Sequence, residues 1–189
     1  MTQSGTIVKA QTARARLSAG NVAFAAAGRS VARADAGLRE QLVAEGQHPF
    51  AAVLACADSR VVPEDIFLCN LGELFVVRVA GNVAGDAQTA SMAYAVEHLG
   101  VKLVVVLGHT HCGAVGAVLG GADESALAAL CEPIAQAIGQ ERDERAATVA
   151  NVRAAVEVLN GALSVAVAEE GVCVVGALYH TGSGEVEWL

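Results

Sequence analysis

The chain has 189 residues, which is enough for one domain with a substantial hydrophobic core and too few for two domains of ordinary size. Its formal net charge is −8, and no basic stripe is present that would collect phosphates, so we expect neither a nucleic-acid partner nor an anionic membrane partner. Hydrophobic residues make up 54% of the chain and charged residues 17%, which is little charge for the surface of a small monomer. We therefore expect part of the surface to contact another subunit.

The sequence also indicates a compartment. The longest apolar runs, such as 103–107 and 172–178, are far below the ~20 residues that a membrane-spanning helix needs. The first residues lack the basic start and apolar stretch of a secretory signal. The five cysteines are odd in number and spread along the chain, which indicates reduced thiols or metal ligands rather than a disulfide framework. These features predict a cytoplasmic protein without a membrane partner.

The first expected elements are helical. Residues 7–45 are rich in Ala, Leu, Arg and Gln, and we expect Gly20, Gly28 and Gly37 to break this segment into short helices. We therefore take residues 1–45 as an N-terminal helical arm and residues 46–189 as the α/β body of a protein that is one domain overall.

Further along the chain, apolar runs bounded by turn residues predict strands, and periodic apolar positions predict helices between them. The expected strands span 50–55, 74–79, 101–107, 172–178 and 185–189. The expected helices span 86–99 and 146–159, and the Ala- and Leu-rich segment from 113 to about 139 is also expected to be helical. Strands that alternate with helices imply an α/β fold with a mainly parallel central sheet flanked by helices. The turn at 182–184 makes the last strand an antiparallel edge strand.

Two short segments carry the candidate metal-binding residues. Cys56-Ala57-Asp58-Ser59-Arg60 follows the first expected strand, and His109-Thr110-His111-Cys112 follows the third. Parallel sheets place ligands beyond the carboxyl ends of their strands, so the two segments meet if these strands are neighbours. Two thiolates, an imidazole and a carboxylate suit a four-coordinate zinc ion better than other common metals. Cys112 also precedes an expected helix, whose positive end lowers the pKa of a thiol.

Cysteines and charged residues can also have purely structural roles. A cysteine in an Ala- and Val-rich segment is usually a small core residue, and we assign that role to Cys69, Cys131 and Cys173. Asp58 and Arg60 taken alone would be a salt bridge at the end of a strand. Because Cys56 stands two positions before Asp58, a functional role is the better interpretation.

Together, Cys-x-Asp-x-Arg and His-x-x-Cys-Gly resemble the zinc signature of the β-class carbonic anhydrases, and the chain is similar to that family over nearly its whole length. Further matching segments, in the same order, are Pro63, 72–78, Gly81-Asn82, 94–100, 132–134 and 174–177. The resemblance implies one zinc ion (Zn2+) per chain, bound by Cys56, His109 and Cys112, with a fourth position left for water. In some family members the carboxylate that matches Asp58 takes this position, in a closed state of the site.

The reaction that the resemblance implies is the reversible hydration of carbon dioxide to bicarbonate and a proton by a zinc-bound hydroxide. Zinc lowers the pKa of its bound water to about 7, which makes the nucleophile available near neutral pH. Asp58 and Arg60 are then the catalytic dyad, in which Arg60 grips the carboxylate and Asp58 orients the nucleophile and accepts its proton. If the grip failed, Asp58 would occupy the open position on the metal.

The resemblance also implies substrate-binding residues. These are Gln47 as a hydrogen-bond donor, Phe75 and Tyr94 as aromatic pocket residues supplied by the adjoining subunit, and Gly113. Without the family, Phe75 and Tyr94 would be core residues at strand and helix spacing. With it, the active site for CO2 and bicarbonate lies at a dimer interface, and the arm 1–45 packs on the partner subunit. We therefore expect a homodimer or a larger homo-oligomer built from dimers.

Two other functions stay open at this level. The same site could hydrolyse a related heterocumulene such as COS or CS2, or the chain could be a non-catalytic zinc-binding or thiol redox protein. Intact Asp58 and Arg60 argue against the redox or storage function, because simple metal storage needs no such dyad.

Overall fold

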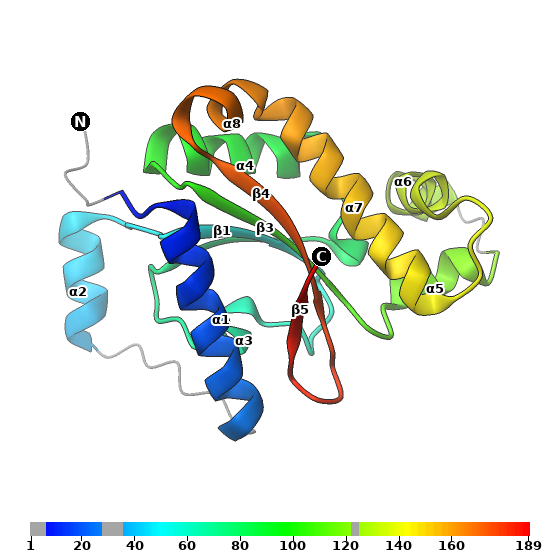
Figure 1. Cartoon of the computed structure of the whole chain (residues 1–189), viewed down its shortest axis with the longest axis horizontal. Helices are drawn as coiled ribbons and strands as arrows, with labels where there is room; N and C mark the ends of the chain where they lie inside the picture. Colours follow the sequence, from blue (N-terminus) through cyan, green and yellow to red (C-terminus); the bar gives the residue numbers. More distant parts are fainter. Residues whose placement is uncertain (1–6, 28–35, 122–124) are drawn as a thin grey trace.

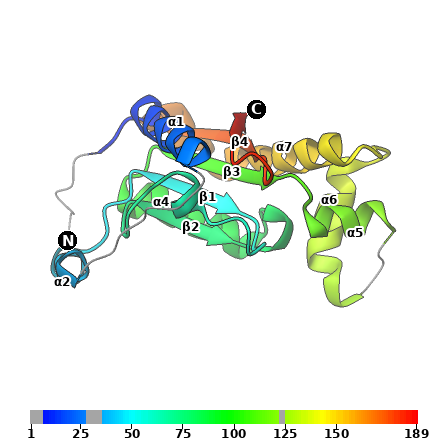
Figure 2. The same ribbon diagram turned by 90° about the horizontal axis from the view of Figure 1, so that it is seen from below.

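A computed structural model describes residues 7–27, 36–121 and 125–189. Within them a single sheet has the strand order β2-β1-β3-β4-β5 (Figures 1 and 2). The strands are β1 (Ala51–Ala55), β2 (Leu74–Arg78), β3 (Leu103–His109), β4 (Cys173–Tyr179) and β5 (Val186–Trp188). The pairs β1–β2, β1–β3 and β3–β4 are parallel, and β5 runs antiparallel to β4 at the edge. The predicted α/β fold with a mainly parallel sheet and an antiparallel C-terminal edge strand is confirmed.

The apolar sequences of β1 and β3 follow from the position of these strands in the sheet. Every residue of β1 and of β3 is buried, because helices cover both faces of the sheet. Val53 and Val105 face one side, and Leu54 and Val106 face the other. A half-buried strand would alternate polar and apolar residues, whereas these strands are apolar throughout.

Helices form a layer on each side of the sheet (Figure 1). On one side lie α1 (Ala10–Ala27) and α3 (Pro63–Ile66), and Ala13 and Leu17 of α1 are fully buried against the sheet of their own chain. On the other side lie α4 (Asp86–Leu99), α7 (Glu144–Ala162) and α8 (Ser164–Glu170). Whether the arm 1–45 also packs on a partner stays a prediction, and residues 1–6 and 28–35 of that arm lie outside the described residues.

The two ends of the molecule differ. The short helix η1 (Ala80–Asn82) follows β2, and α5 (Gly113–Leu119), η2 (Ser125–Leu127) and α6 (Ala128–Ile138) stand at the end where β3 terminates (Figures 1 and 2). There a third apolar cluster contains Cys56 and Cys112 together with residues of α5, α6 and α7. At the other end lies α2 (Ala36–Glu45), which has no buried residue.

The expectation that glycines break the N-terminal arm is wrong where the structure describes it. The helix α1 runs through Gly20 without interruption, and α2 begins before Gly37. A Cβ atom built on Gly20 would lie 1.9 Å from the carbonyl oxygen of Phe67, so this glycine allows close approach of α1 to the chain beneath it. Gly28 lies outside the described residues.

Element boundaries also differ from the expected ones. The third strand, expected at 101–107, extends to His109, because Gly108 and His109 continue the pairing with Leu178 and Tyr179. The short helix α3 and the helix α8 were not expected, and the segment 113–139, expected to be helical, contains the helices α5, η2 and α6. Among the described residues, none of the helices combines the length and the apolar character that a membrane crossing requires.

Candidate metal centre

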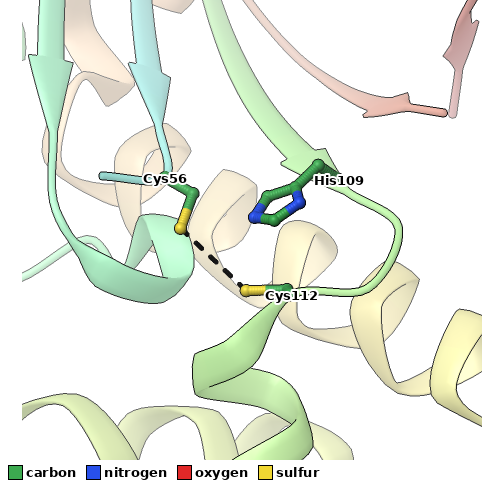
Figure 3. Close-up of side chains that lie close together, drawn as sticks. All are labelled: Cys56, His109 and Cys112. Atoms are coloured by element: carbon green, nitrogen blue, oxygen red, sulfur yellow. Dashed lines mark hydrogen bonds between the residues drawn. The ribbon is translucent and has the colours of Figure 1, made fainter. Parts of the chain in front are cut away.

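The three candidate metal ligands come from two neighbouring strands and the start of one helix. Cys56 directly follows β1, His109 is the last residue of β3, and Cys112 immediately precedes α5. Since β1 and β3 pair in parallel, their carboxyl ends are adjacent. One ligand atom from each residue lies within 4.8 Å of the other two, and the two Sγ atoms are 4.0 Å apart (Figure 3). The structure thus brings together the residues that the sequence predicts as zinc ligands.

The imidazole of His109 is fully buried. Its Nδ1 lies 3.0 Å from the carbonyl oxygen of Thr110, which assigns the ring proton to Nδ1 and leaves the lone pair on Nε2. Among buried side-chain nitrogen and oxygen atoms of the described residues, Nε2 of His109 and Nδ2 of Asn82 have no hydrogen-bond partner. Leaving a buried polar atom unpaired is costly. A buried lone pair beside two thiols therefore fits a zinc ion.

The two cysteine sulfurs lie within hydrogen-bond distance of each other. The contact between Sγ of Cys112 and Sγ of Cys56 lowers the pKa of Cys56 to about 4, with further help from the backbone N–H groups of Asp58 and Gly81. These two N–H groups lie 3.4 and 3.3 Å from Sγ of Cys56. The pKa of Cys112 is raised, first because its proton is held against the Cys56 sulfur and then by burial. The arrangement thus favours a thiolate at Cys56.

The lowered pKa that the sequence predicts for Cys112 is therefore wrong in its net direction. The backbone N–H groups of Val115 and Ala114 at the start of α5 do favour the Cys112 thiolate, as the helix argument requires. Their influence is outweighed by the neighbouring sulfur of Cys56.

The carboxylate of Asp58 lies next to this cluster and is clamped by Arg60. Nε and Nη2 of Arg60 donate to Oδ1 and Oδ2 of Asp58 at 2.9 and 2.7 Å, and the Arg60 backbone N–H donates to Oδ1 at 2.9 Å. Oδ2 of Asp58 is 3.9 Å from Nε2 of His109. The hydrogen bonds from the Arg60 side chain hold the pKa of Asp58 far below its usual range. Asp58 is thus an ionised acceptor beside the three ligands.

The other predicted site residues fall into two groups. Gly113 is the first residue of α5, directly after Cys112, and a Cβ atom there would meet nothing within 4 Å. Gln47 precedes β1, at the opposite end of that strand from Cys56. Phe75 pairs with Ala52 near the start of β2, and its ring centroid is 6.1 Å from that of Tyr94. Within one chain the structure therefore does not bring Gln47, Phe75 or Tyr94 to the metal ligands.

Two residues of the site carry a role that the sequence did not reveal. Arg78 ends β2 and donates from Nε to the carbonyl oxygen of Cys56 at 3.1 Å and from Nη2 to that of Asp58 at 2.6 Å. Gly81 supplies the backbone N–H that reaches the Cys56 sulfur. A charged residue at the carboxyl end of an apolar strand was a usable signal for Arg78. For Gly81 the signal was weaker, because glycine after a strand usually marks a turn.

A buried Cys-His-Cys set beside an ionised carboxylate, at the carboxyl edge of a parallel sheet, defines a mononuclear site for a soft divalent metal. Residues 51–186 match the family model described as carbonic anhydrase. The chain belongs to the β-class carbonic anhydrase family, as its motifs predict.

Relatives with known names agree with this assignment. The chain is 37% identical over 162 residues to a carbonic anhydrase of Mycolicibacterium smegmatis, an alignment that covers 79% of each protein. It is 51% identical over 85 residues to carbonic anhydrase 2 of Mycobacterium tuberculosis, where the match spans 45% of this chain and 41% of the relative. That second alignment therefore covers less than half the length of the relative.

Solved structures support the fold assignment. The β-carbonic anhydrase CafA of Aspergillus fumigatus superposes with a TM-score of 0.70 at 32% identity, covering 81% of this chain and 80% of that one. A tetrameric β-carbonic anhydrase of Sordaria macrospora gives a TM-score of 0.69 at 29% identity, covering 80% of this chain and 85% of the other.

Proposed function

We propose that this protein is a zinc-dependent carbonic anhydrase, which converts CO2 and water to bicarbonate and a proton and catalyses the reverse reaction. The observation that carries the proposal is the pairing of a buried Cys-His-Cys set with the clamped carboxylate of Asp58. Membership of the family supports the same reaction. A protein that only stores metal would have no use for an ionised carboxylate held 3.9 Å from the unpaired nitrogen of His109.

One zinc ion per chain would be held by Sγ of Cys56, Nε2 of His109 and Sγ of Cys112. Three protein ligands leave a fourth position for water, and zinc lowers the pKa of that water to about 7. The chain contributes one thiolate at Cys56, whose pKa is already lowered to about 4, and a lone pair on Nε2 fixed by the Thr110 carbonyl. These ligands are buried and need little rearrangement to bind a metal.

Asp58 acts in this proposal as the acceptor that orients the attacking water and takes its proton. Arg60 keeps the carboxylate ionised and aims it, since both oxygens are held. If Arg60 released the carboxylate, Asp58 would become free to serve as a fourth metal ligand, as in the closed state that the family resemblance implies for some members. In this proposal, the contact with Arg60 determines whether Asp58 acts as a proton acceptor or as a metal ligand.

We also propose that Gln47, Phe75 and Tyr94 complete the substrate pocket of a partner subunit in a homodimer. Phe75 belongs to β2, which forms one edge of the sheet, and the side chain of Tyr94 is 47% exposed beside it. An aromatic pair at the edge of a sheet suits a subunit contact better than a monomer surface. The tetrameric relative of Sordaria macrospora is consistent with an assembly built from dimers.

A cytoplasmic location completes the proposal. All five cysteines are free, including the buried Cys56, Cys69 and Cys112. Free thiols of this kind are typical of a reducing compartment.

The decisive experiment is stopped-flow CO2 hydration by the purified protein, with COS and CS2 hydrolysis measured in parallel. We expect CO2 to be the preferred substrate, activity to be lost when a chelator strips the metal, and zinc to restore it while magnesium does not. Preferred turnover of COS or CS2 would assign the alternative hydrolase function. Zinc binding without turnover of any of the three substrates would refute an enzymatic role.

A further inference from the structure

Asn151 is a polar residue in the middle of the buried face of α7. Its neighbours on that face include Ala147, Val152 and Ala155, and Asn151 itself is only 3% exposed. A buried amide is costly unless it is hydrogen-bonded. Nδ2 of Asn151 donates to the carbonyl oxygen of Gly81 at 2.8 Å, so the helix is tied to a residue 70 positions earlier in the chain. This contact needs an explanation beyond packing.

Gly81 connects that contact to the metal centre. The backbone N–H of Gly81 donates to Sγ of Cys56 at 3.3 Å, while its carbonyl oxygen accepts from Asn151. The φ angle of Gly81 is 69°, and a Cβ atom there would lie 2.6 Å from Cδ1 of Ile134, so only glycine fits. Glycine has the most permissive backbone of any residue. The direction of its N–H must therefore be fixed by contacts, and Asn151 supplies one.

We propose that Asn151 is a positioning residue for the metal centre, which holds Gly81 so that its N–H points at the sulfur of Cys56. An N–H group that donates to a metal-bound thiolate fixes the sulfur's orientation and offsets part of its charge. Asn151 touches neither substrate nor metal and acts through Gly81 alone. The inference rests on the proposed zinc site.

The test compares zinc release from holoprotein variants to an excess of chelator. Asn151→Leu keeps a side chain branched at Cγ and removes the donor, and Asn151→Ala removes the whole amide. Substitution of a residue that supports a metal ligand typically lowers metal affinity by about 10- to 100-fold. We therefore expect zinc to be released about 10-fold faster from both variants than from the wild type. In the cobalt-substituted protein we expect a shifted thiolate-to-cobalt absorption band.

Thr148→Val is the matched control. Thr148 lies one turn earlier on the same buried face, is 1% exposed, and its hydroxyl donates to the Glu144 carbonyl of its own helix. We expect zinc release from this variant within about twofold of the wild type. Unchanged release from folded Asn151 variants would overturn the proposal, and so would equal acceleration in Thr148→Val, since general loosening of α7 would then explain both.

Wild-type protein provides a measurement that needs no variant. In the cadmium-113 form, NMR should detect coupling through the hydrogen bond from the Gly81 amide proton to cadmium, and coupling from Nδ2 of Asn151 to the Gly81 carbonyl carbon. Absence of either coupling contradicts the proposal even if the Asn151 variants do not fold. None of these measurements uses CO2, so a wild type without hydration activity would refute the proposed function and leave this test valid.

Discussion

The two ends of β1 contrast sharply. Beyond its carboxyl end, Cys56, His109 and Cys112 converge within 4.8 Å and are buried, and their polar contacts come from their own chain. Before its start lies Gln47, exposed to solvent, and Phe75 and the half-exposed Tyr94 stand on the neighbouring edge. The first region is a candidate metal site whose three ligand residues all come from one chain. Under the proposed function, the second is half of a pocket that a second copy must complete.

Removal of a metal ligand should have the largest effect. We expect the zinc content of His109→Ala to fall from about one per chain to near zero, because two thiols alone make a poor tetrahedral site. Cys173→Ser, which alters an exposed cysteine on β4, should keep its zinc and serves as the control. Metal analysis after gel filtration measures both. Full zinc occupancy in His109→Ala would show that the first region is not the metal site.

Disruption of the clamp should come next. We expect Asp58→Asn to lower the CO2 hydration rate by about 10²-fold or more while zinc stays bound, since loss of a positioned proton acceptor typically costs that much. Glu169→Gln, an exposed carboxylate on α8, should leave the rate unchanged. Stopped-flow assays and metal analysis of the same samples separate chemistry from binding. An Asp58→Asn enzyme with wild-type turnover would reject the assigned role.

Mixed dimers test the contrast itself. Gln47→Ala should lose activity by about 10²-fold, as expected for a lost donor to substrate. When Gln47→Ala and His109→Ala chains are co-expressed, about half of the dimers contain one chain of each kind. Each mixed dimer has one intact site of two, formed by the metal ligands of the Gln47→Ala chain and Gln47 of the His109→Ala chain. We therefore expect about a quarter of wild-type activity. Asp58→Asn with His109→Ala should recover none, since both changes lie in the same half. Equal behaviour of the two pairs would place the whole site within one chain.

Substitution of Gly20 tests whether the helix α1 packs on the sheet of its own chain. A Cβ atom at Gly20 would collide with the Phe67 carbonyl, so we expect Gly20→Ala to cost about 2 kcal/mol of stability. For a chain of this size that lowers Tm by about 6 °C. Gly161→Ala, in α7 with nothing within 4 Å of the new atom, should be neutral or slightly stabilising. An unchanged Tm in Gly20→Ala would mean that α1 is not held against the sheet as described.

The ion pair between Arg145 and Glu187, on the edge strand β5, lies outside both regions. Its removal should have the smallest effect on stability. Nη2 of Arg145 donates to Oε1 and Oε2 of Glu187 at 2.8 and 2.7 Å, which lowers the pKa of Glu187. A lowered pKa stabilises the fold above the usual value of about 4.3, and this contribution is lost as the pH falls through the lower folded value. We expect Glu187→Gln to cost about 0.5 kcal/mol at pH 7 and to converge with the wild type in acid. Denaturation across pH, with unchanged zinc content, checks this.

The sequence reveals the chemistry of the metal site better than its surroundings. Cys56, His109 and Cys112 were predictable because they follow two expected parallel strands, whose carboxyl ends share one edge of the sheet, and because thiolates and imidazole together suit zinc. The direction of the Cys112 pKa was not, because it depends on a 4.0 Å approach to Cys56 that no local pattern encodes. Asn151 resembled any polar residue on a helix until packing placed it against Gly81.

The same distinction holds for the fold. Apolar runs predicted every strand of the described sheet, yet Gly108 looked like the end of the third strand. Pairing with Leu178, 70 positions away, carries that strand on to His109. Gly20 likewise looked like a helix breaker, whereas the carbonyl of Phe67 beneath it explains why it has no side chain. Local patterns identify elements, and contacts between remote segments decide where the elements end.

Arg60 serves two loops at once. The same Nη2 atom that donates to Asp58 also donates to the carbonyl oxygen of His111 at 3.0 Å. His111 has a φ angle of 57°, and it is the residue whose turn lets His109 and Cys112 approach one point. Under the proposed function, a guanidinium that swings away from the carboxylate would also release the backbone between two ligands. One side-chain movement would then free Asp58 to reach the metal and loosen the turn that sets the spacing of His109 and Cys112, so a change of ligand set and a change of loop shape would occur together.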